Sequence, residues 1–177
     1  MVRAGEYNTK THDGTEQYYS VHKIIPHPEF NKVTAQNDIA LMRINSQFAF
    51  NNNVRAICLP ASANSPTGCF VTGWGETHGH QDSSFLKKAS VSIVPLAECR
   101  TDYANVGYNV FDNNICASGG GNDACEGDSG GPLVCMEQGA CHLKGLVLWG
   151  KQCGDGRFPG VYTRVFSYRE WIHNIIS

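Results

Sequence analysis

Eight cysteines constrain this 177-residue chain more than any other feature. Reducing compartments keep thiols free, whereas secreted domains collect disulfides, so the count favours an extracellular location. A structural zinc site would need close pairs of the C-x-x-C type, and none of the eight cysteines forms one. The first ten residues contain no apolar signal-peptide core. We therefore expect a secreted, disulfide-bonded chain whose export signal lies ahead of Met1.

Charge and length exclude several other classes of protein. The formal net charge of −2 provides no electrostatic attraction to nucleic acid or to an anionic membrane surface. No apolar run reaches the ~18 residues that would span a bilayer, so we expect no membrane segment. The length suits a single domain, residues 1–177.

Short runs of branched and aromatic residues, separated by Gly, Asn and Pro, indicate an all-β fold of the sandwich or barrel kind. The expected strands are Gln17–Ile25, Ile39–Ile44, Cys69–Gly73, Ala89–Val94, Pro132–Met136, His142–Trp149 and Gly160–Val165. The end of the chain differs. A capping Ser167 precedes apolar residues at helical spacing, which predicts a C-terminal helix that packs through Trp171, Ile172, Ile175 and Ile176.

Residues 123–132, which we call the serine loop, contain the largest number of candidate catalytic residues close together in the sequence. A serine that attacks a carbonyl needs neighbours without side chains, so that substrate can approach and backbone N–H groups can converge on the developing oxyanion. Gly127, Gly130 and Gly131 provide that clearance around Ser129. A surface turn rich in Gly, Asp and Ser is the plainer alternative on composition alone.

The run Gly-Asp-Ser-Gly-Gly-Pro at 127–132 resembles the chymotrypsin/trypsin family of serine proteases, the family from which the standard account of the Ser-His-Asp triad is drawn. The resemblance continues along the chain in order, through residues 2–8, 24–28, 37–41, 69–75, 114–117, 149–150 and 159–165. It implies a two-β-barrel fold with a C-terminal helix. Residues 1–60 would be the remainder of an incomplete first barrel, and residues 61–177 the second barrel and the helix.

The resemblance also implies roles for individual residues. Ser129 matches the nucleophile and Asp38 the carboxylate that orients the base, while the N–H groups of Gly127 and Ser129 match the oxyanion hole. The family's general base is a histidine in an Ala-Ala-His-Cys segment that would precede Val2. None of the chain's seven histidines matches that base, and we expect ordinary packing or surface roles for His12, His22, His27, His78, His80, His142 and His173.

Asp128 matches the carboxylate that, in the activated family members, pairs with a newly freed N-terminal amine. Because an unpaired buried carboxylate is costly, we expect Asp128 to turn toward solvent or another donor. The loop at Gly127 would then be in a zymogen-like state.

Substrate preference follows from the same resemblance. Asp123 matches the base of the primary substrate pocket, where a carboxylate selects Arg or Lys, and Gly150 and Gly160 match glycines of the pocket walls. Trp149 and Leu148 match the neighbouring substrate-binding segment. The family has a serine at the position of Leu148, and its hydroxyl bonds the triad aspartate, so Asp38 would lose a donor here. The alternative for Asp123 is a loop residue that bonds only backbone groups.

Eight cysteines allow 105 connectivities, and spacing alone does not select one. The resemblance implies the bridges Cys69–Cys135, Cys99–Cys116 and Cys125–Cys153. Cys58 matches a position that tethers an upstream pro-segment or light chain in multidomain relatives, whereas Cys141 is not a usual family position. We expect Cys58 and Cys141 to pair with each other, with an upstream partner for Cys58 as the alternative.

A further group of residues falls at the positions of the family's calcium loop. Carboxylates would come from Glu6, Asp13 and Glu16, and backbone oxygens from Asn8 and Thr11, a set of hard oxygen ligands that suits Ca²⁺. An acidic, solvated hairpin is the equal alternative, and no cofactor is required for the chemistry itself.

Together these features predict a trypsin-like serine endopeptidase that cleaves after Arg or Lys through an acyl-enzyme on Ser129. Its partners would be protein and peptide substrates and protein protease inhibitors. Without the histidine and the activating N-terminus, we expect the chain as written to be inactive alone. The competing class is a non-catalytic homologue that acts as a binding or regulatory module. The intact serine loop favours the enzyme, and Leu148 favours the homologue.

Overall fold

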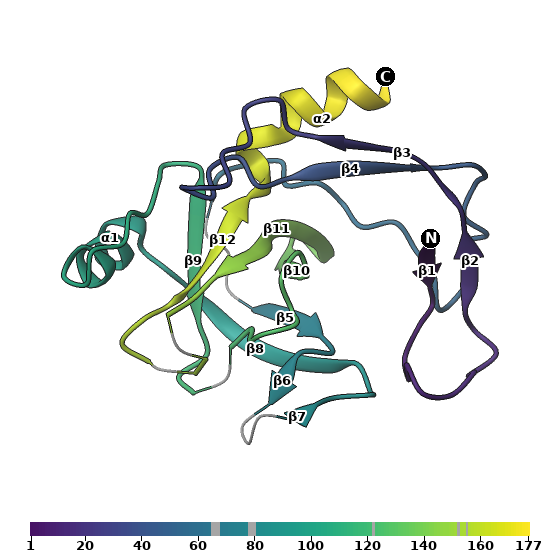
Figure 1. Cartoon of the computed structure of the whole chain (residues 1–177), viewed down its shortest axis with the longest axis horizontal. Coiled ribbons are helices and arrows are strands. Elements are labelled where there is room, and N and C mark those ends of the chain that lie inside the picture. Colours follow the sequence, from purple (N-terminus) through teal and green to yellow (C-terminus); the bar gives the residue numbers. More distant parts are fainter. Residues whose placement is uncertain (65–67, 78–80, 122, 152, 155) are drawn as a thin grey trace.

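The molecule is built around one closed barrel (Figure 1). The computed structural model describes residues 1–64, 68–77, 81–121, 123–151, 153–154 and 156–177. Six antiparallel strands form the barrel in the order β10-β11-β12-β9-β8-β5. Their bounds are β5 (Cys69–Gly73), β8 (Lys87–Val94), β9 (Asn114–Ser118), β10 (Pro132–Glu137), β11 (Ala140–Trp149) and β12 (Gly160–Arg164).

Alternation of inward and outward side chains fills the barrel interior. On β10, Leu133 and Cys135 are both fully buried, and they pack with Val71, Val91 and Tyr162 from neighbouring strands. Gly145 lies where a Cβ atom would approach the Tyr162 Cβ to 2.9 Å, so the packed interior leaves no room for a side chain there.

The first 60 residues do not form a second barrel. Strands β1 (Val2–Ala4) and β2 (Gln17–Tyr19) make one two-stranded sheet, and β3 (Val21–Pro26) and β4 (Ala40–Ile44) make another. Figure 1 shows the β1–β2 pair to one side of the barrel and β3–β4 running across its top. Large apolar side chains are left in solvent, with Ile24 61% and Met42 59% exposed. The fold is therefore chymotrypsin-like with an incomplete first barrel, as the sequence predicts.

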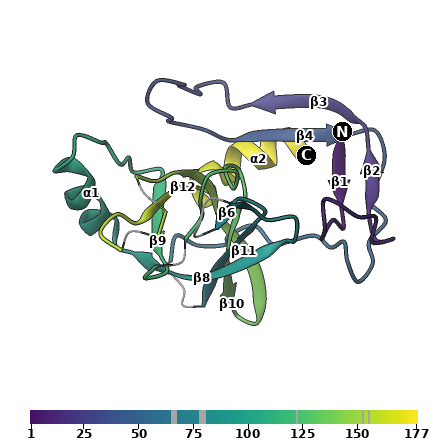
Figure 2. The ribbon, with the colours of Figure 1, turned by 60° about the horizontal axis from the view of Figure 1, so that its bottom comes forward.

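Short elements connect and cover the barrel. They are β6 (Glu76–Thr77), β7 (Gln81–Asp82), α1 (Leu96–Ala104), the 3₁₀ turn η1 (Val165–Tyr168) and α2 (Arg169–Ile176). Figures 1 and 2 both place α2 beside β3 and β4, where Ile172 and Tyr168 pack against Ile39. Within the described part of the chain, no helix has the length and apolar character to cross a bilayer.

Several predicted elements have different bounds. The run Gln17–Ile25 divides into two strands at Ser20. The C-terminal helix begins at Arg169 rather than at a capping Ser167, because η1 occupies the residues before it and Tyr168 takes the cap position without a side-chain bond. Ile176 does not pack as expected, since it is 64% exposed at the end of the chain.

Three disulfides confirm the pairings implied by the family resemblance. They are Cys69–Cys135, Cys99–Cys116 and Cys125–Cys153, with Cα–Cα distances of 4.0, 6.5 and 5.2 Å. Cys69 and Cys135 are also register partners on neighbouring barrel strands, and such cross-links stabilise mainly by restricting the unfolded chain.

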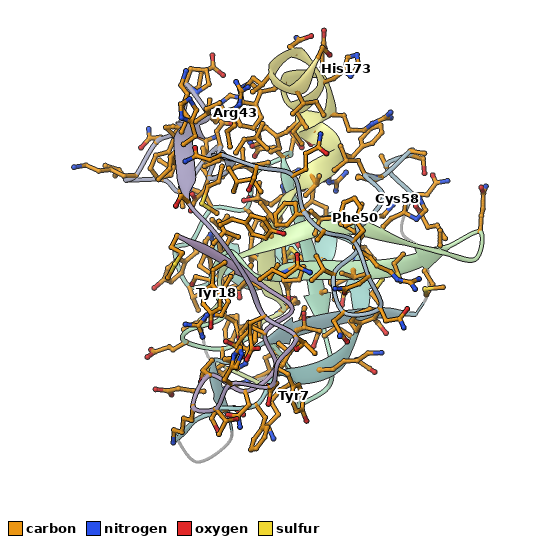
Figure 3. All side chains as sticks on the ribbon, turned by 90° about the vertical axis from the view of Figure 1, so that its right-hand side faces the viewer. Tyr7, Tyr18, Arg43, Phe50, Cys58 and His173 are labelled. Carbon is orange, nitrogen blue, oxygen red and sulfur yellow. A yellow bond between two sulfur atoms is a disulfide. The ribbon has the colours of Figure 1, made fainter. Side chains whose placement is uncertain are left out.

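The expected Cys58–Cys141 pairing is wrong, because both cysteines are free and exposed in the structure. Figure 3 shows Cys58 on the linker that passes beside β10 and β11. Its backbone forms a parallel bridge with His142, with the Cys58 N–H donating to the Cys141 carbonyl at 3.3 Å. Side chains alternate along a strand, so the Cys58 thiol shares a face with His142 and the Cys141 thiol points to the opposite face.

The barrel core should dominate the stability of the fold. Replacing the fully buried Leu133 by Ala removes apolar contacts and leaves a cavity, and we expect the free energy of unfolding to fall by ~2–5 kcal/mol. Ile24→Ala is the control, since this side chain is 61% exposed, and it should change the value by less than ~0.5 kcal/mol. Urea unfolding followed by circular dichroism measures both variants. Equal losses in the two variants would contradict the assigned core.

Candidate functional site

A cavity of about 1030 Å³ opens beside the serine loop. The loop supplies Asp123 and Ser129, the end of β11 supplies Leu148 and Trp149, and the start of β12 supplies Gly160. These three segments are far apart in sequence, and the barrel register and the Cys125–Cys153 disulfide bring them together.

Asp123 lies within the cavity and is held by three donors. The carboxylate Oδ1 accepts hydrogen bonds from the Ala124 N–H at 2.8 Å and the Tyr162 hydroxyl at 3.0 Å, and Oδ2 accepts one from the Gly160 N–H at 3.2 Å. Burial still raises the pKa of Asp123 above its ordinary value, although all three hydrogen bonds act to lower it. Burial also raises the pKa of Tyr162, with the Asp123 charge as the next cause. The cavity therefore contains a fixed carboxylate that a bound cation would stabilise.

The glycines near Asp123 keep the cavity open. A Cβ atom at Gly160 would lie 2.9 Å from Asp123 Oδ1, so any side chain there would displace the carboxylate. Gly150 also lines the cavity and has open space around its Cα. A side chain at 150 would narrow the cavity without a clash. Both walls thus leave room for a long, slender group to reach Asp123.

Asp128 anchors the serine loop to a glycine turn. Its Oδ1 accepts from the Gly75 N–H at 2.8 Å, and its Oδ2 accepts from the Cys125 N–H at 3.0 Å. The carboxylate fits tightly, because a Cβ atom at Gly73 would lie 1.8 Å from Asp128 Oδ1 and one at Gly75 would lie 2.6 Å from Asp128 Cγ. The backbone after β5 and the loop that bears Ser129 are therefore joined through this one carboxylate.

Ser129 is exposed at the cavity and sits between turns that are fixed on both sides. Gly127 and Gly130 have φ of 90° and 80°, in the left-handed region that favours glycine. The Gly130 N–H donates to the Val147 carbonyl at 2.8 Å, and the Val147 N–H donates to the Gly131 carbonyl at 2.8 Å. These bonds pin the residues after the serine to β11.

Asp38 is not among the described residues that line this cavity. Its carbonyl accepts a hydrogen bond from the Thr163 hydroxyl at 2.9 Å. The preceding Asn37 has φ of 56°, and its Oδ1 accepts from Asn113 Nδ2 at 3.0 Å and from the Tyr168 hydroxyl at 2.9 Å. This network ties the Asp38 loop to β12 and to the turn before α2. The only local indication of this network in the sequence is the Asn that precedes Asp38.

Leu148 and His27 pack against other side chains. Leu148 packs against the buried cluster that contains Tyr103, Val110 and Val161, and it also lines the cavity. Among the described residues that line the cavity, none is a histidine. His27 contacts the rings of Tyr168 and Trp171. His78 and His80 lie outside the described residues.

The predicted calcium loop brings three carboxylates together. Oxygen atoms of Glu6, Asp13 and Glu16 all lie within 4.8 Å of one another. Glu6 Oε1 is buried and has no hydrogen-bond partner. Burial acts to raise the pKa of Glu16, but backbone N–H groups, first that of Asp13, bring it below the ordinary value. The Asn8 carbonyl accepts from the Thr11 N–H at 3.1 Å. An unpartnered buried oxygen within a carboxylate cluster fits a hard cation.

The fold and this arrangement define a serine-protease type of domain, and comparison with known proteins identifies its family. The sequence model of the family described as Trypsin matches residues 1–172. Trypsin-1 of Astacus astacus is 43% identical over 176 residues, which cover 97% of this chain and 73% of that protein. Trypsin of Sus scrofa is 39% identical over 182 residues (100% and 76%), and Trypsin-3 of Salmo salar 38% over 182 residues (100% and 74%). The chain belongs to the trypsin family, whose members are serine endopeptidases.

The contact between Gly75 and Asp128 gives a test of the site. In Gly75→Ala, the new Cβ would meet Asp128 Cγ and the Glu126 carbonyl oxygen, both at 2.6 Å. Such overpacking should lower the free energy of unfolding by ~1–3 kcal/mol. Gly150→Ala is the matched control, because nothing lies within 4 Å of the added atom. Urea unfolding followed by tryptophan fluorescence compares them, and equal stability of the two variants would argue against the anchored loop.

Proposed function

We propose that this chain carries the site of a trypsin-like serine endopeptidase that cleaves peptide bonds after Arg or Lys. The observation that supports it most is the position of Asp123, a carboxylate within a cavity that Ser129 also lines. A guanidinium or ammonium group entering the cavity would gain a charged partner in a partly buried site. Aspartate at this position thus selects cationic side chains over acidic or apolar ones.

Peptide hydrolysis would proceed in two steps, acylation of Ser129 and hydrolysis of the acyl-enzyme. The Ser129 hydroxyl oxygen bonds to the substrate carbonyl carbon, its proton passes to a base, and the amine leaves with a proton to give an acyl-enzyme. Water then attacks the same carbon and releases the acid and the free serine. In this scheme the Gly127 and Ser129 N–H groups donate to the developing oxyanion, and Asp38 orients the base.

The 177 residues alone should catalyse this reaction poorly. A serine hydroxyl is a weak nucleophile until a positioned base accepts its proton, and the described lining of the cavity holds no histidine. Asp128 is bonded to the Gly75 and Cys125 N–H groups, so its carboxylate is already occupied. We propose that this is a zymogen-like arrangement of the loop.

We also propose where the protein is located and which partners it binds. Three disulfides support an extracellular, secreted protein. Its partners would be protein substrates with exposed Arg or Lys and protein inhibitors that present such a residue to the cavity. We also propose that the exposed Cys58 can join an upstream pro-segment or light chain through a disulfide.

A non-catalytic homologue is the second candidate, and Leu148 is the observation that favours it. A leucine side chain has no hydroxyl to donate to Asp38, and this one packs against the buried cluster that contains Tyr103. A hydrogen bond to a charged acceptor contributes about 1.5–3 kcal/mol. Labelling of Ser129 by a serine-directed fluorophosphonate, measured on the full-length protein, separates the two candidates, because a module that only binds partners should not react.

Binding of 4-aminobenzamidine, a fluorescent aryl cation, tests the cavity without requiring catalysis. The ionised Asp123 attracts the amidinium, and a proton competes with it, so affinity should fall as the pH falls through the raised pKa of Asp123. The loss should therefore begin at a higher pH than the pKa of an ordinary aspartate would give. Asp123→Asn should weaken binding at least ~10-fold at pH 8, about 1.4 kcal/mol, and remove the pH dependence.

Asp112→Asn is the matched control for this titration, because its side chain is 96% exposed and it does not line the cavity. It should bind the amidinium as the unsubstituted chain does, with the same pH profile. Unchanged affinity in Asp123→Asn would refute the cation pocket.

We also propose a structural Ca²⁺ site at Glu6, Asp13 and Glu16. A ligand that binds only the folded chain raises the free energy of unfolding, by ~2.7 kcal/mol when its free concentration is 100 times Kd, and the unfolding temperature rises with it. Millimolar Ca²⁺ should raise the melting temperature of the unsubstituted chain and of Glu29→Gln, an exposed carboxylate outside the cluster. Glu16→Gln should lose the response. An equal calcium response in both variants would leave the acidic hairpin as the correct account.

A further inference from the structure

Two sulfur atoms meet on the outer face of the barrel, away from the cavity described above. Met136 on β10 and Cys141 on β11 are direct cross-strand partners, and the Cys141 Sγ lies 3.2 Å from the Met136 Sδ. The tight turn between them, with φ of 51° at Gln138 and 80° at Gly139, fixes their register. The hairpin backbone thus places the two residues opposite each other, on the same face of the strand pair.

Both sulfur atoms are accessible. Met136 is 43% exposed, Cys141 is exposed and free, and both line an open groove of about 750 Å³ with Gly68, Phe70, Lys88 and Ser118. The hairpin that bears them is braced by a buried ion pair, in which Lys144 Nζ lies 2.7 Å from Glu137 Oε1. An exposed pair of sulfur ligands on a braced hairpin can take up a ligand without unfolding its surroundings.

From this pair we infer a binding site for a soft monovalent metal ion, of the class of Cu(I) or Ag(I). A thiolate and a thioether are soft ligands that select Cu(I) over harder ions such as Mg²⁺ or Ca²⁺. The thiol proton now lies on the path between the two sulfurs, where the thiol donates toward the thioether. The metal ion replaces that proton: Cys141–SH and M⁺ give a Cys141 thiolate bound to M⁺ with Met136 as second ligand, and one H⁺ is released.

Cys58 provides an internal comparison. It is also free and exposed, but its backbone is paired with His142, which places its thiol on the face opposite to that of Cys141 and Met136. The same molecule therefore offers one thiol on the face of His142, at Cys58, and one thiol beside a thioether, at Cys141. If the two-sulfur arrangement matters, the two thiols should differ in metal affinity.

The experiment uses the folded chain with its three disulfides intact and Cu(I) kept reduced by ascorbate under nitrogen. Competition with a chromophoric Cu(I) chelator measures affinity in Cys58→Ser, where Cys141 is the one remaining free thiol, and in Cys141→Ser, where Cys58 is. We expect Cys58→Ser to bind one Cu(I) at least tenfold more tightly. X-ray absorption should show two sulfur neighbours of copper in Cys58→Ser and one in Cys141→Ser.

A double variant isolates the thioether. Adding Met136→Leu to Cys58→Ser keeps the volume of the side chain and the Cys141 thiol, and it should lower Cu(I) affinity at least tenfold and remove one sulfur neighbour. Circular dichroism checks that the barrel is retained. Equal affinity of Cys58→Ser with and without Met136→Leu would overturn the site, as would equal affinity of the two single-thiol variants. Neither outcome depends on proteolytic activity.

Discussion

The hydrogen bonds that the Asp128 carboxylate accepts from two backbone N–H groups fix the position of the serine loop. One carboxylate joins the turn after β5 to the segment that begins at Cys125. The turn accepts it only because Gly73 and Gly75 have no side chains. A charged group of this kind is stable in a partly buried place when several donors surround it. The position of Ser129, immediately after Asp128, is therefore a consequence of this contact and of the bonds from Gly130 and Gly131 to β11.

The cavity follows from the same construction. The Cys125–Cys153 disulfide holds its two sides together, and Gly160 keeps β12 far enough back for Asp123 to accept three hydrogen bonds. Burial raises the pKa of Asp123, so its charge is costly in the empty cavity and is stabilised when a cation enters. Selection for Arg and Lys would thus follow from a carboxylate whose three hydrogen bonds do not fully offset the cost of burying its charge. The chain belongs to the trypsin family, whose members are serine endopeptidases, so the cation would belong to a peptide substrate.

The local sequence pattern predicted the strands in which inward and outward side chains alternate clearly. It did not predict elements whose stabilising contacts lie far away in the sequence. Cys69–Gly73 has the predicted bounds because its inward residues alternate with outward ones. Strand β9 and helix α1 were not predicted, since Asn114–Ser118 is buried almost throughout and α1 buries only Cys99 and Tyr103. The family resemblance supplied three disulfides and the serine loop. It could not supply the Cys58–Cys141 geometry, which a non-local bridge to His142 determines, nor the Asn37 network, whose partners lie more than 70 residues away.

A crystal structure of the 177-residue chain with 4-aminobenzamidine would test the central claim, that a half-buried carboxylate in this cavity receives cations, most directly. The account predicts both amidinium nitrogens within hydrogen-bonding distance of Asp123, with Tyr162 and Gly160 still donating to the carboxylate. An amidinium bound elsewhere, or an Asp123 side chain turned out of the cavity, would contradict it.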